Sequence, residues 1–146
     1  MAMKKDMAAI LIIIAAAIGA AVWFGSKPNV EKQLGVQLPK SMAVVKFKKH
    51  PLSGDIDIKL SFDEDDFALA ARSLEEFCQN ECYIRLGDNE RLPYFQNIIS
   101  WWDLDISKVE FAYQNFTGGR WGLKTKEQYV IVGKAMDGNT YFYLVL

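Results

Sequence analysis

Few residues in this 146-residue chain have the types and spacing that enzyme or metal chemistry requires. The single histidine, His50, excludes an H-E-x-x-H zinc motif and precedes Pro51, so we expect an exposed turn residue there. A Ser-His-Asp triad would have to use His50, yet no G-x-S-x-G motif, G-x-G-x-x-G motif or P-loop occurs. One histidine and two cysteines are too few for a closed four-ligand zinc site. We therefore expect no enzyme activity, no cofactor and no metal site.

The two cysteines, Cys78 and Cys82, have three residues between them rather than the two of a redox C-x-x-C motif. They fall at the end of a predicted helix and at the start of the next predicted strand. In an oxidising compartment, a disulfide between them would tie the helix end to the strand. Closing so short a loop would add on the order of 2 kcal/mol in the chain-entropy model. The alternative is a pair of reduced thiols, with Cys78 in the core.

Carboxylates are the remaining candidates for acid–base chemistry. Asp57, Asp103 and Asp105 support a less favoured hypothesis, a carboxylate-based hydrolase of the cell envelope, because catalysis by two carboxylates leaves no sequence motif. The acidic run 63–66 lacks the spaced ligands and the glycine of an EF-hand loop. Its position at the start of a predicted helix suits the helix dipole, which explains the run without a calcium ion.

Aromatic residues are more numerous than one helix face and alternating strands need. Core packing accounts for most of them, and the remainder predict a surface for a protein partner, because aromatic side chains bury much area at little entropic cost. The residues predicted to form this partner surface are Tyr94, Phe95, Trp101, Trp102, Tyr141 and Tyr143.

An uncharged stretch near the start of the chain determines the cellular location that we expect for the protein. No charged residue occurs between Asp6 and Lys27, and residues 7–24 are apolar apart from one glycine. Twenty helical residues at about 1.5 Å each cover roughly 30 Å, the thickness of the hydrocarbon core of a bilayer. Trp23 falls where such a helix would leave the hydrocarbon. The alternatives are a cleaved signal peptide and a helix buried in a protein core.

Charge then sets the expected orientation and partners. The short basic tail at 1–6 favours a cytoplasmic N-terminus, so the domain would lie on the periplasmic or extracellular side of the inner (plasma) membrane. The formal net charge of −1 argues against nucleic acid as a partner. The predicted segments are a cytoplasmic tail at 1–6, a transmembrane signal anchor at 7–26, a juxtamembrane linker at 27–40 and an extracytoplasmic domain at 41–146.

Hydrophobic periodicity predicts an α+β domain. Apolar residues alternate along 43–47 and 56–62, which predicts a hairpin of half-buried strands, and they recur every three or four residues along 63–80, which predicts a helix. Asp137-Gly138 predicts a hairpin turn. The expected fold is a mostly antiparallel sheet with one or two helices packed on a face. Further predicted elements are a helix at 93–102 and strands at 83–86, 109–113, 120–125, 129–135 and 140–146.

Residues 34–145 carry the pattern Leu34-Gly35-x-x-Leu38-Pro39-x-Ser41, followed by Gly54-Asp55, Phe67, Trp101-Trp102 and a tyrosine-rich closing strand. In this pattern the chain resembles small bacterial envelope proteins of unknown function. Those proteins are tethered by an N-terminal helix or a lipid and carry one α+β domain, so the resemblance implies the same localisation and architecture. It supplies no catalytic residues.

Together these observations predict a single-pass membrane-anchored envelope protein whose α+β domain binds another envelope component. It would act as an accessory or assembly factor or as an inhibitor. The main alternative is an immunity protein against an envelope-targeted toxin, which also acts by binding.

Overall fold

The computed structural model describes residues 2–26, 28–81, 83–86, 103–117 and 126–146 of the chain. The helix predicted at 93–102 and the strand predicted at 120–125 lie outside these residues. The elements in chain order are α1 (Ala2–Gly25), α2 (Val30–Leu34), β1 (Ala43–Lys49), β2 (Ile56–Ser61), α3 (Glu64–Asn80), β3 (Ile84–Arg85), β4 (Leu104–Thr117), β5 (Lys126–Ala135) and β6 (Thr140–Val145).

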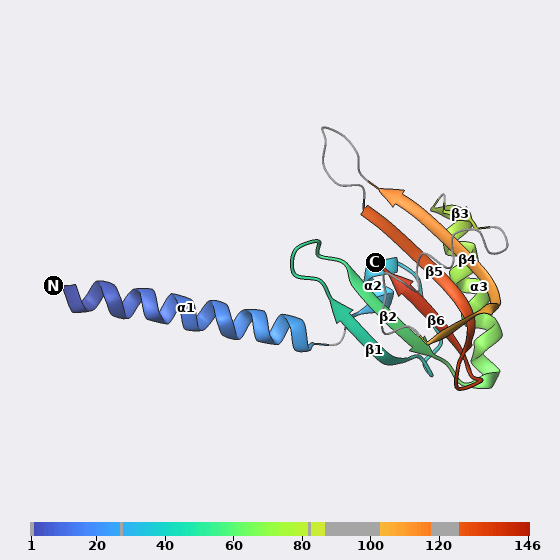
Figure 1. Cartoon of the computed structure of the whole chain (residues 1–146), viewed down its shortest axis with the longest axis horizontal. Helices are drawn as coiled ribbons and strands as arrows, with labels where there is room; N and C mark the ends of the chain where they lie inside the picture. Colours follow the sequence, from blue (N-terminus) through green and yellow to red (C-terminus); the bar gives the residue numbers. More distant parts are fainter. Residues whose placement is uncertain (1, 27, 82, 87–102, 118–125) are drawn as a thin grey trace.

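The strands form one six-stranded sheet in the order β1-β2-β6-β5-β4-β3, and each neighbouring pair is antiparallel. The predicted hairpin of β1 and β2 is present, and so is the β5–β6 hairpin around Gly138, whose φ of 86° suits glycine. Pairing of β2 with β6 brings Asp57 opposite Val145 and Lys59 opposite Tyr143. The predicted α+β fold with a mostly antiparallel sheet is confirmed (Figure 1).

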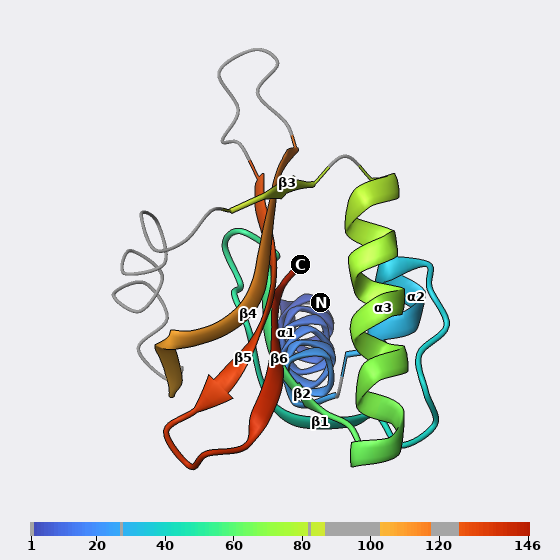
Figure 2. The same ribbon diagram turned by 90° about the vertical axis from the view of Figure 1, so that its right-hand side faces the viewer.

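One face of the sheet carries the main hydrophobic core. Figure 2 shows α2 and α3 on the same side of the sheet. The inward stripe of α3 follows the predicted three- and four-residue spacing, and its Ala70, Leu74 and Cys78 are wholly buried. They belong to the same core as side chains that alternate along three strands: Ile58, Leu60, Val130, Val132, Phe142 and Leu144.

The disulfide predicted between Cys78 and Cys82 stays a prediction. Cys78 carries a free thiol in this structure, and Cys82 lies outside the described residues. Cys78 continues the inward stripe of α3, so its side chain is buried in the apolar core. Burial, helped by the nearby charge of Glu75, raises the pKa of this thiol to about 12.

Cys78 should therefore resist alkylation in the native protein. At pH 8 an ordinary thiol with a pKa near 8.5 is roughly one quarter thiolate, whereas a pKa of about 12 leaves about one thiol in ten thousand ionised. In a Cys82→Ser background, we expect iodoacetamide to label Cys78 at least about a thousandfold more slowly than in urea-unfolded chain. Comparable rates in the two states would contradict this burial.

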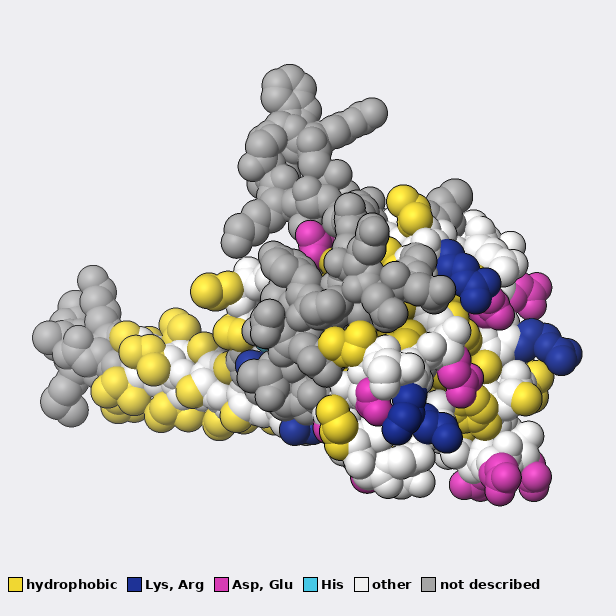
Figure 3. Space-filling view, turned by 45° about the vertical axis from the view of Figure 1, so that its right-hand side comes forward, with side chains coloured by type: hydrophobic (Ala, Val, Ile, Leu, Met, Phe, Trp, Pro, Cys, Tyr) yellow, Lys and Arg dark blue, Asp and Glu magenta, His cyan; other side chains and the backbone are white. Residues whose placement is uncertain are grey.

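Helix α1 extends away from the domain (Figure 1). Its described apolar side chains are largely exposed, including Ile12 and Ile13 at 69% and 67%, and Figure 3 shows hydrophobic side chains along its visible side. Where the structure describes the chain, we find no helix with the combined length and apolarity of a membrane span. The predicted helix is thus present, and its passage through a membrane stays a prediction.

Lys49 of the domain contacts the end of α1. The Lys49 ammonium donates hydrogen bonds to the carbonyl oxygen of Trp23 and, at 3.0 Å, to the Oγ of Ser26. It also lies 4.8 Å from the centroid of the Trp23 ring. A cation at a helix C-terminus is favoured by the helix dipole, because the last carbonyl groups lack partners within the helix. Lys49 therefore joins β1 to the end of α1.

A glycine permits the close approach of β4 to β5. A Cβ at position 133 would lie 2.8 Å from Leu104 Cδ1 and 3.1 Å from both the Lys108 carbonyl oxygen and Val109 Cα. Two of these neighbours are backbone atoms in the irregular part of the β4–β5 pairing. We expect Gly133→Ala to lower the free energy of unfolding by about 1–3 kcal/mol in urea denaturation. Exposed Lys134→Ala, the control, should change it by less than about 0.5 kcal/mol.

Candidate functional site

The sheet face opposite α3 carries a second buried cluster, and no helix of the described chain covers it (Figure 2). Polar side chains are buried on the same face: Asp57 and Lys59 of β2 and Gln114 of β4. Burying polar groups is costly unless they have hydrogen-bond partners, so these residues mark where the fold maintains a specific arrangement. The apolar part of the cluster is formed by Leu104, Ala112, Tyr129, Ile131, Tyr143 and Val145.

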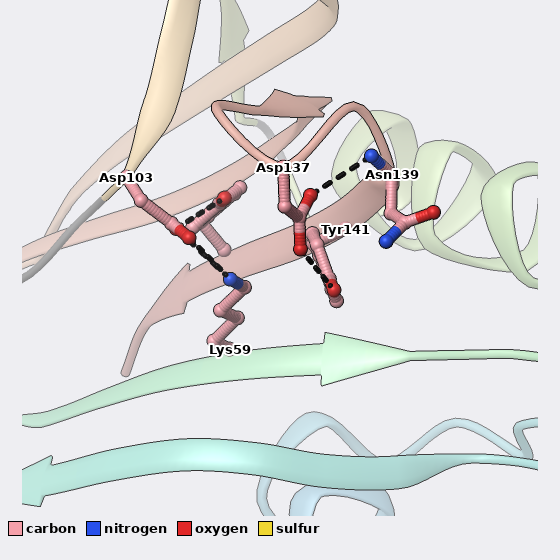
Figure 4. A network of polar contacts seen from close by, with 6 residues as sticks. Lys59, Asp103, Asp137, Asn139 and Tyr141 are labelled. Atoms are coloured by element: carbon pink, nitrogen blue, oxygen red, sulfur yellow. Dashed lines mark hydrogen bonds and ion pairs between the residues drawn. The ribbon is translucent and has the colours of Figure 1, made fainter.

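Lys59 is the centre of the candidate site, since only 6% of the residue is exposed. Its Nζ lies 2.9 Å from both carboxylate oxygens of Asp103 and donates hydrogen bonds to them. The same ammonium lies 3.8 Å from the centroid of the Tyr141 ring (Figure 4). A carboxylate and an aromatic face thus replace the water that the ammonium loses on folding.

Asp103, directly before β4, is hydrogen-bonded to residues at the end of β5 and in β6. Its backbone carbonyl oxygen accepts a hydrogen bond of 2.7 Å from the Met136 N–H at the end of β5, which fixes the chain just before β4. The Tyr143 hydroxyl donates to Oδ1 of Asp103 at 3.0 Å. Partial burial opposes ionisation of Asp103, but the hydrogen bonds from Lys59 and Tyr143 outweigh it and lower its pKa. Burial raises the pKa of Tyr143 well above its ordinary value.

Tyr141 is fixed at its hydroxyl as well as at its ring. The hydroxyl donates to Oδ2 of Asp137 at 2.8 Å, and this hydrogen bond raises the pKa of Tyr141. Asp137 in turn accepts the Asn139 backbone N–H at 2.8 Å, which closes the β5–β6 turn and lowers the pKa of Asp137 (Figure 4). We call Lys59, Asp103, Asp137, Tyr141 and Tyr143 the Lys59 cluster. It presents a half-buried tyrosine whose conformation is set before any partner arrives.

The six residues of the predicted partner surface have different outcomes. Tyr141 is half-buried within the Lys59 cluster, so part of its ring reaches solvent. Tyr143 is wholly buried, and its place on the predicted surface is therefore wrong: it belongs to the second buried cluster, and its hydroxyl donates to Asp103. The other four lie outside the described residues: Tyr94, Phe95, Trp101 and Trp102.

The three carboxylates of the hydrolase hypothesis are engaged by different partners. Oδ2 of Asp57 lies 2.6 Å from Nε2 of His50, Asp103 pairs with Lys59, and Asp105 pairs with Lys108 at 3.1 Å. Desolvation raises the pKa of Asp57, although His50 opposes the shift. Among the described residues, no group of three or more potential ligands could hold a metal ion. Each of the three carboxylates therefore has its own basic partner.

His50 differs from its predicted role as an exposed turn residue. It ends the β1 side of the hairpin as expected, but its side chain is only 36% exposed and it partners the buried carboxylate of Asp57. The alternation of β2 placed Asp57 on a solvent-facing side, so no sequence signal pointed to this pair. The structure thus converts an isolated histidine into an ion-pairing residue when it is protonated.

Comparison of the chain with protein-family models, with curated proteins and with solved structures finds no match. The sequence predicted Tyr141 as part of a partner surface. It did not indicate that Lys59, Asp103 and Asp137 form the network that holds this side chain. The one available signal was the Asp137-Gly138 turn, which places a carboxylate four residues before Tyr141.

Proposed function

We propose that this protein is a single-pass membrane-anchored envelope protein whose α+β domain binds another envelope protein through the surface around the Lys59 cluster. In this proposal it acts as an accessory or assembly factor or as an inhibitor, and not as an enzyme. The observation that carries the proposal is the arrangement of Tyr141, held between the Lys59 ammonium and the Asp137 carboxylate while remaining partly exposed.

A fixed, half-exposed tyrosine is well suited to partner binding. Binding normally costs about 0.5–1.5 kcal/mol for each flexible side chain that becomes immobilised. The contacts of Tyr141 with Lys59 and Asp137 meet that cost during folding. Tyrosines in such positions are among the residues that dominate interface energetics, because the ring buries much area and the hydroxyl keeps a polar partner.

The anchoring part of the proposal is supported by helix α1. Large hydrophobic side chains are exposed along it, and the sequence has no charge between Asp6 and Lys27. Apolar surface of this extent is unfavourable in water, and a lipid bilayer would cover it. We propose the orientation with the domain on the periplasmic or extracellular side of the inner (plasma) membrane, which agrees with the resemblance to tethered envelope proteins.

Co-purification tests the binding function. The full chain would be extracted from its native membranes with mild detergent, and proteins retained with wild type and with Tyr141→Ala would be compared by quantitative mass spectrometry. We expect a specific partner to decrease by about 30-fold in Tyr141→Ala, which corresponds to roughly 2 kcal/mol of binding free energy. The matched control is Leu69→Ala, since Leu69 is 54% exposed on α3 at the other side of the sheet.

The outcome distinguishes binding from general damage. Equal retention by wild type, Leu69→Ala and Tyr141→Ala would contradict the proposed surface. A toxin as the captured protein would identify the inhibitory form of the proposal, an immunity protein. We keep that possibility within the same binding function, because either partner would use the same surface.

A further inference from the structure

A cavity of about 590 Å³ lies where the end of α1 meets the domain, on the side of the sheet covered by helices. Its described lining combines the ends of α1, α2 and α3 with the β1–β2 turn and residues of β4 and β5. Cavities of this size accommodate small organic ligands. The cavity is separate from the Lys59 cluster, so an inference about its ligand does not depend on the proposed partner surface.

Aromatic rings form one part of the lining. Trp23 contributes from the last turn of α1, and Phe77 and Tyr83 contribute from the region where α3 ends, with ring centroids 5.5 Å apart. The hydrogen bond from Lys49 to the Trp23 carbonyl and the contact of its ammonium with the indole ring hold Trp23 at this position. The cavity therefore has rings that the fold positions, from elements far apart in the sequence.

The rest of the described lining consists of Gly54, three aliphatic side chains and four polar side chains, and most of the polar ones have unused hydrogen-bonding capacity. The Gln128 side-chain oxygen accepts the Tyr83 hydroxyl at 3.3 Å, which leaves its amide N–H groups for another acceptor. Among the described residues, the side chains of Gln33, Glu81 and Asn115 have no hydrogen-bond partner. An amide both donates and accepts, so three amides and one carboxylate offer donors and acceptors side by side.

The charge of the lining narrows the class of ligand. Glu81 is the one Asp or Glu residue of the described lining, which contains no lysine, arginine or histidine. One described cation, Lys49, lies against the Trp23 ring outside the lining and is already bonded to the Trp23 carbonyl oxygen and Ser26 Oγ. A phosphate or carboxylate ligand would therefore find no cation in the described lining itself and would be repelled by Glu81. An uncharged sugar ring has an apolar C–H face that packs on aromatic rings. Its rim of hydroxyl groups both donates and accepts, as the amides require.

We propose that this cavity is a binding site for an uncharged saccharide of one or two rings. The C–H face of the sugar packs on the aromatic side of the cavity, at Trp23. Its hydroxyl groups bond the Gln128 amide, the Asn115 amide and the Glu81 carboxylate. Gln33 of α2 contributes at the rim, where its side chain is exposed.

The test is an NMR titration of the isotope-labelled full chain in detergent micelles. The probes are maltose and N,N′-diacetylchitobiose as uncharged sugars, and glucose 6-phosphate as an anionic one. We expect saturable shifts for the uncharged sugars at the indole N–H of Trp23 and at the side-chain amides of Asn115 and Gln128. Glucose 6-phosphate should bind at least about tenfold more weakly than an uncharged sugar.

Two variants make the test specific. Gln128→Glu keeps an acceptor for the Tyr83 hydroxyl but removes the amide donor, and we expect about fivefold to tenfold weaker sugar binding with the spectrum of the fold preserved. Gln33→Ala should weaken sugar binding by about fivefold. Gln37 is also exposed but lies outside the described lining of this cavity, so Gln37→Ala should not weaken sugar binding. No saturable shift with either uncharged sugar, or equal effects of Gln33→Ala and Gln37→Ala, would overturn the proposal.

Discussion

Asp103→Ala is expected to lower the free energy of unfolding by roughly 2–3 kcal/mol, because it leaves the buried Lys59 ammonium without its anion. The variant also removes the acceptor of the buried Tyr143 hydroxyl. This loss is at or below the lower end of the range for breaking a buried ion pair. The reason is that 42% of the Asp103 side chain is exposed, so water can partly replace its carboxylate beside Lys59. Urea denaturation of the full chain in micelles measures the change.

Substitution of the other member of the ion pair, Lys59, gives the control. Lys59→Met removes the buried charge itself and keeps an apolar stem of similar length, so we expect a loss smaller than that of Asp103→Ala. Adding Lys59→Met to Asp103→Ala should restore part of the stability, because the unpaired ammonium is gone. Equal losses in the two single variants, with additive effects in the double variant, would show that Lys59 and Asp103 do not act as a pair.

The pH dependence of this pair has a defined sign. The folded-state pKa of Asp103 is lowered, so its contribution is fully present above the unfolded pKa, near 3.9, and is lost as the pH falls through the folded value. Asp103→Asn cannot titrate, and the stability difference between wild type and this variant should therefore shrink as the pH falls below about 4. A difference that stays constant from pH 7 to acid would contradict the ionic pairing.

The second large effect is expected from charge placed in α1. Ile13→Lys combined with Ile14→Lys adds two ammonium groups at the centre of the uncharged stretch, each costing about 2.5–3.5 kcal/mol in membrane insertion. We expect wild type to stay in the membrane pellet after alkaline carbonate washing and the double variant to move to the soluble fraction. Ile13→Leu with Ile14→Leu is the matched control and should stay in the pellet.

Intact-mass measurement of the membrane-bound protein separates anchoring from cleavage. An uncleaved anchor predicts a mass that includes residues 7–26. A mature protein that begins near Val22 and washes off with carbonate would contradict anchoring and would support a cleaved signal peptide. The mature protein would then have no membrane anchor at 7–26, while the fold of the domain and its proposed partner surface would be unaffected.

The elements that local burial patterns determine were predictable from the sequence. The three- and four-residue spacing along 63–80 predicted α3, because one stripe of a helix must face a core. Alternation predicted β1 and β2, and Asp137-Gly138 predicted the β5–β6 hairpin. Strand β4 extends further than expected, from Leu104, because its first residues pair with the end of β5 and lack a clear alternation of their own.

The features that depend on contacts across the sheet were not predictable. Alternation in β2 assigned Asp57 and Lys59 to a solvent-facing side, but both are buried: Asp57 contacts His50, and Lys59 contacts Asp103 and lies opposite Tyr143 of β6. Tyr143 moved from the predicted surface to the interior for the same reason. The burial of Cys78 was predictable, because it continues the three- and four-residue spacing of the inward stripe of α3.

Photocrosslinking in intact cells tests the central claim most directly. A p-benzoylphenylalanine residue would replace Tyr141 in the full chain, and in a matched strain it would replace the exposed Leu69 on α3. If the surface around the Lys59 cluster binds a partner, light should produce one discrete adduct from position 141 in the membrane fraction, and it should be absent from position 69. No adduct at position 141, or the same adducts at both positions, would contradict the account.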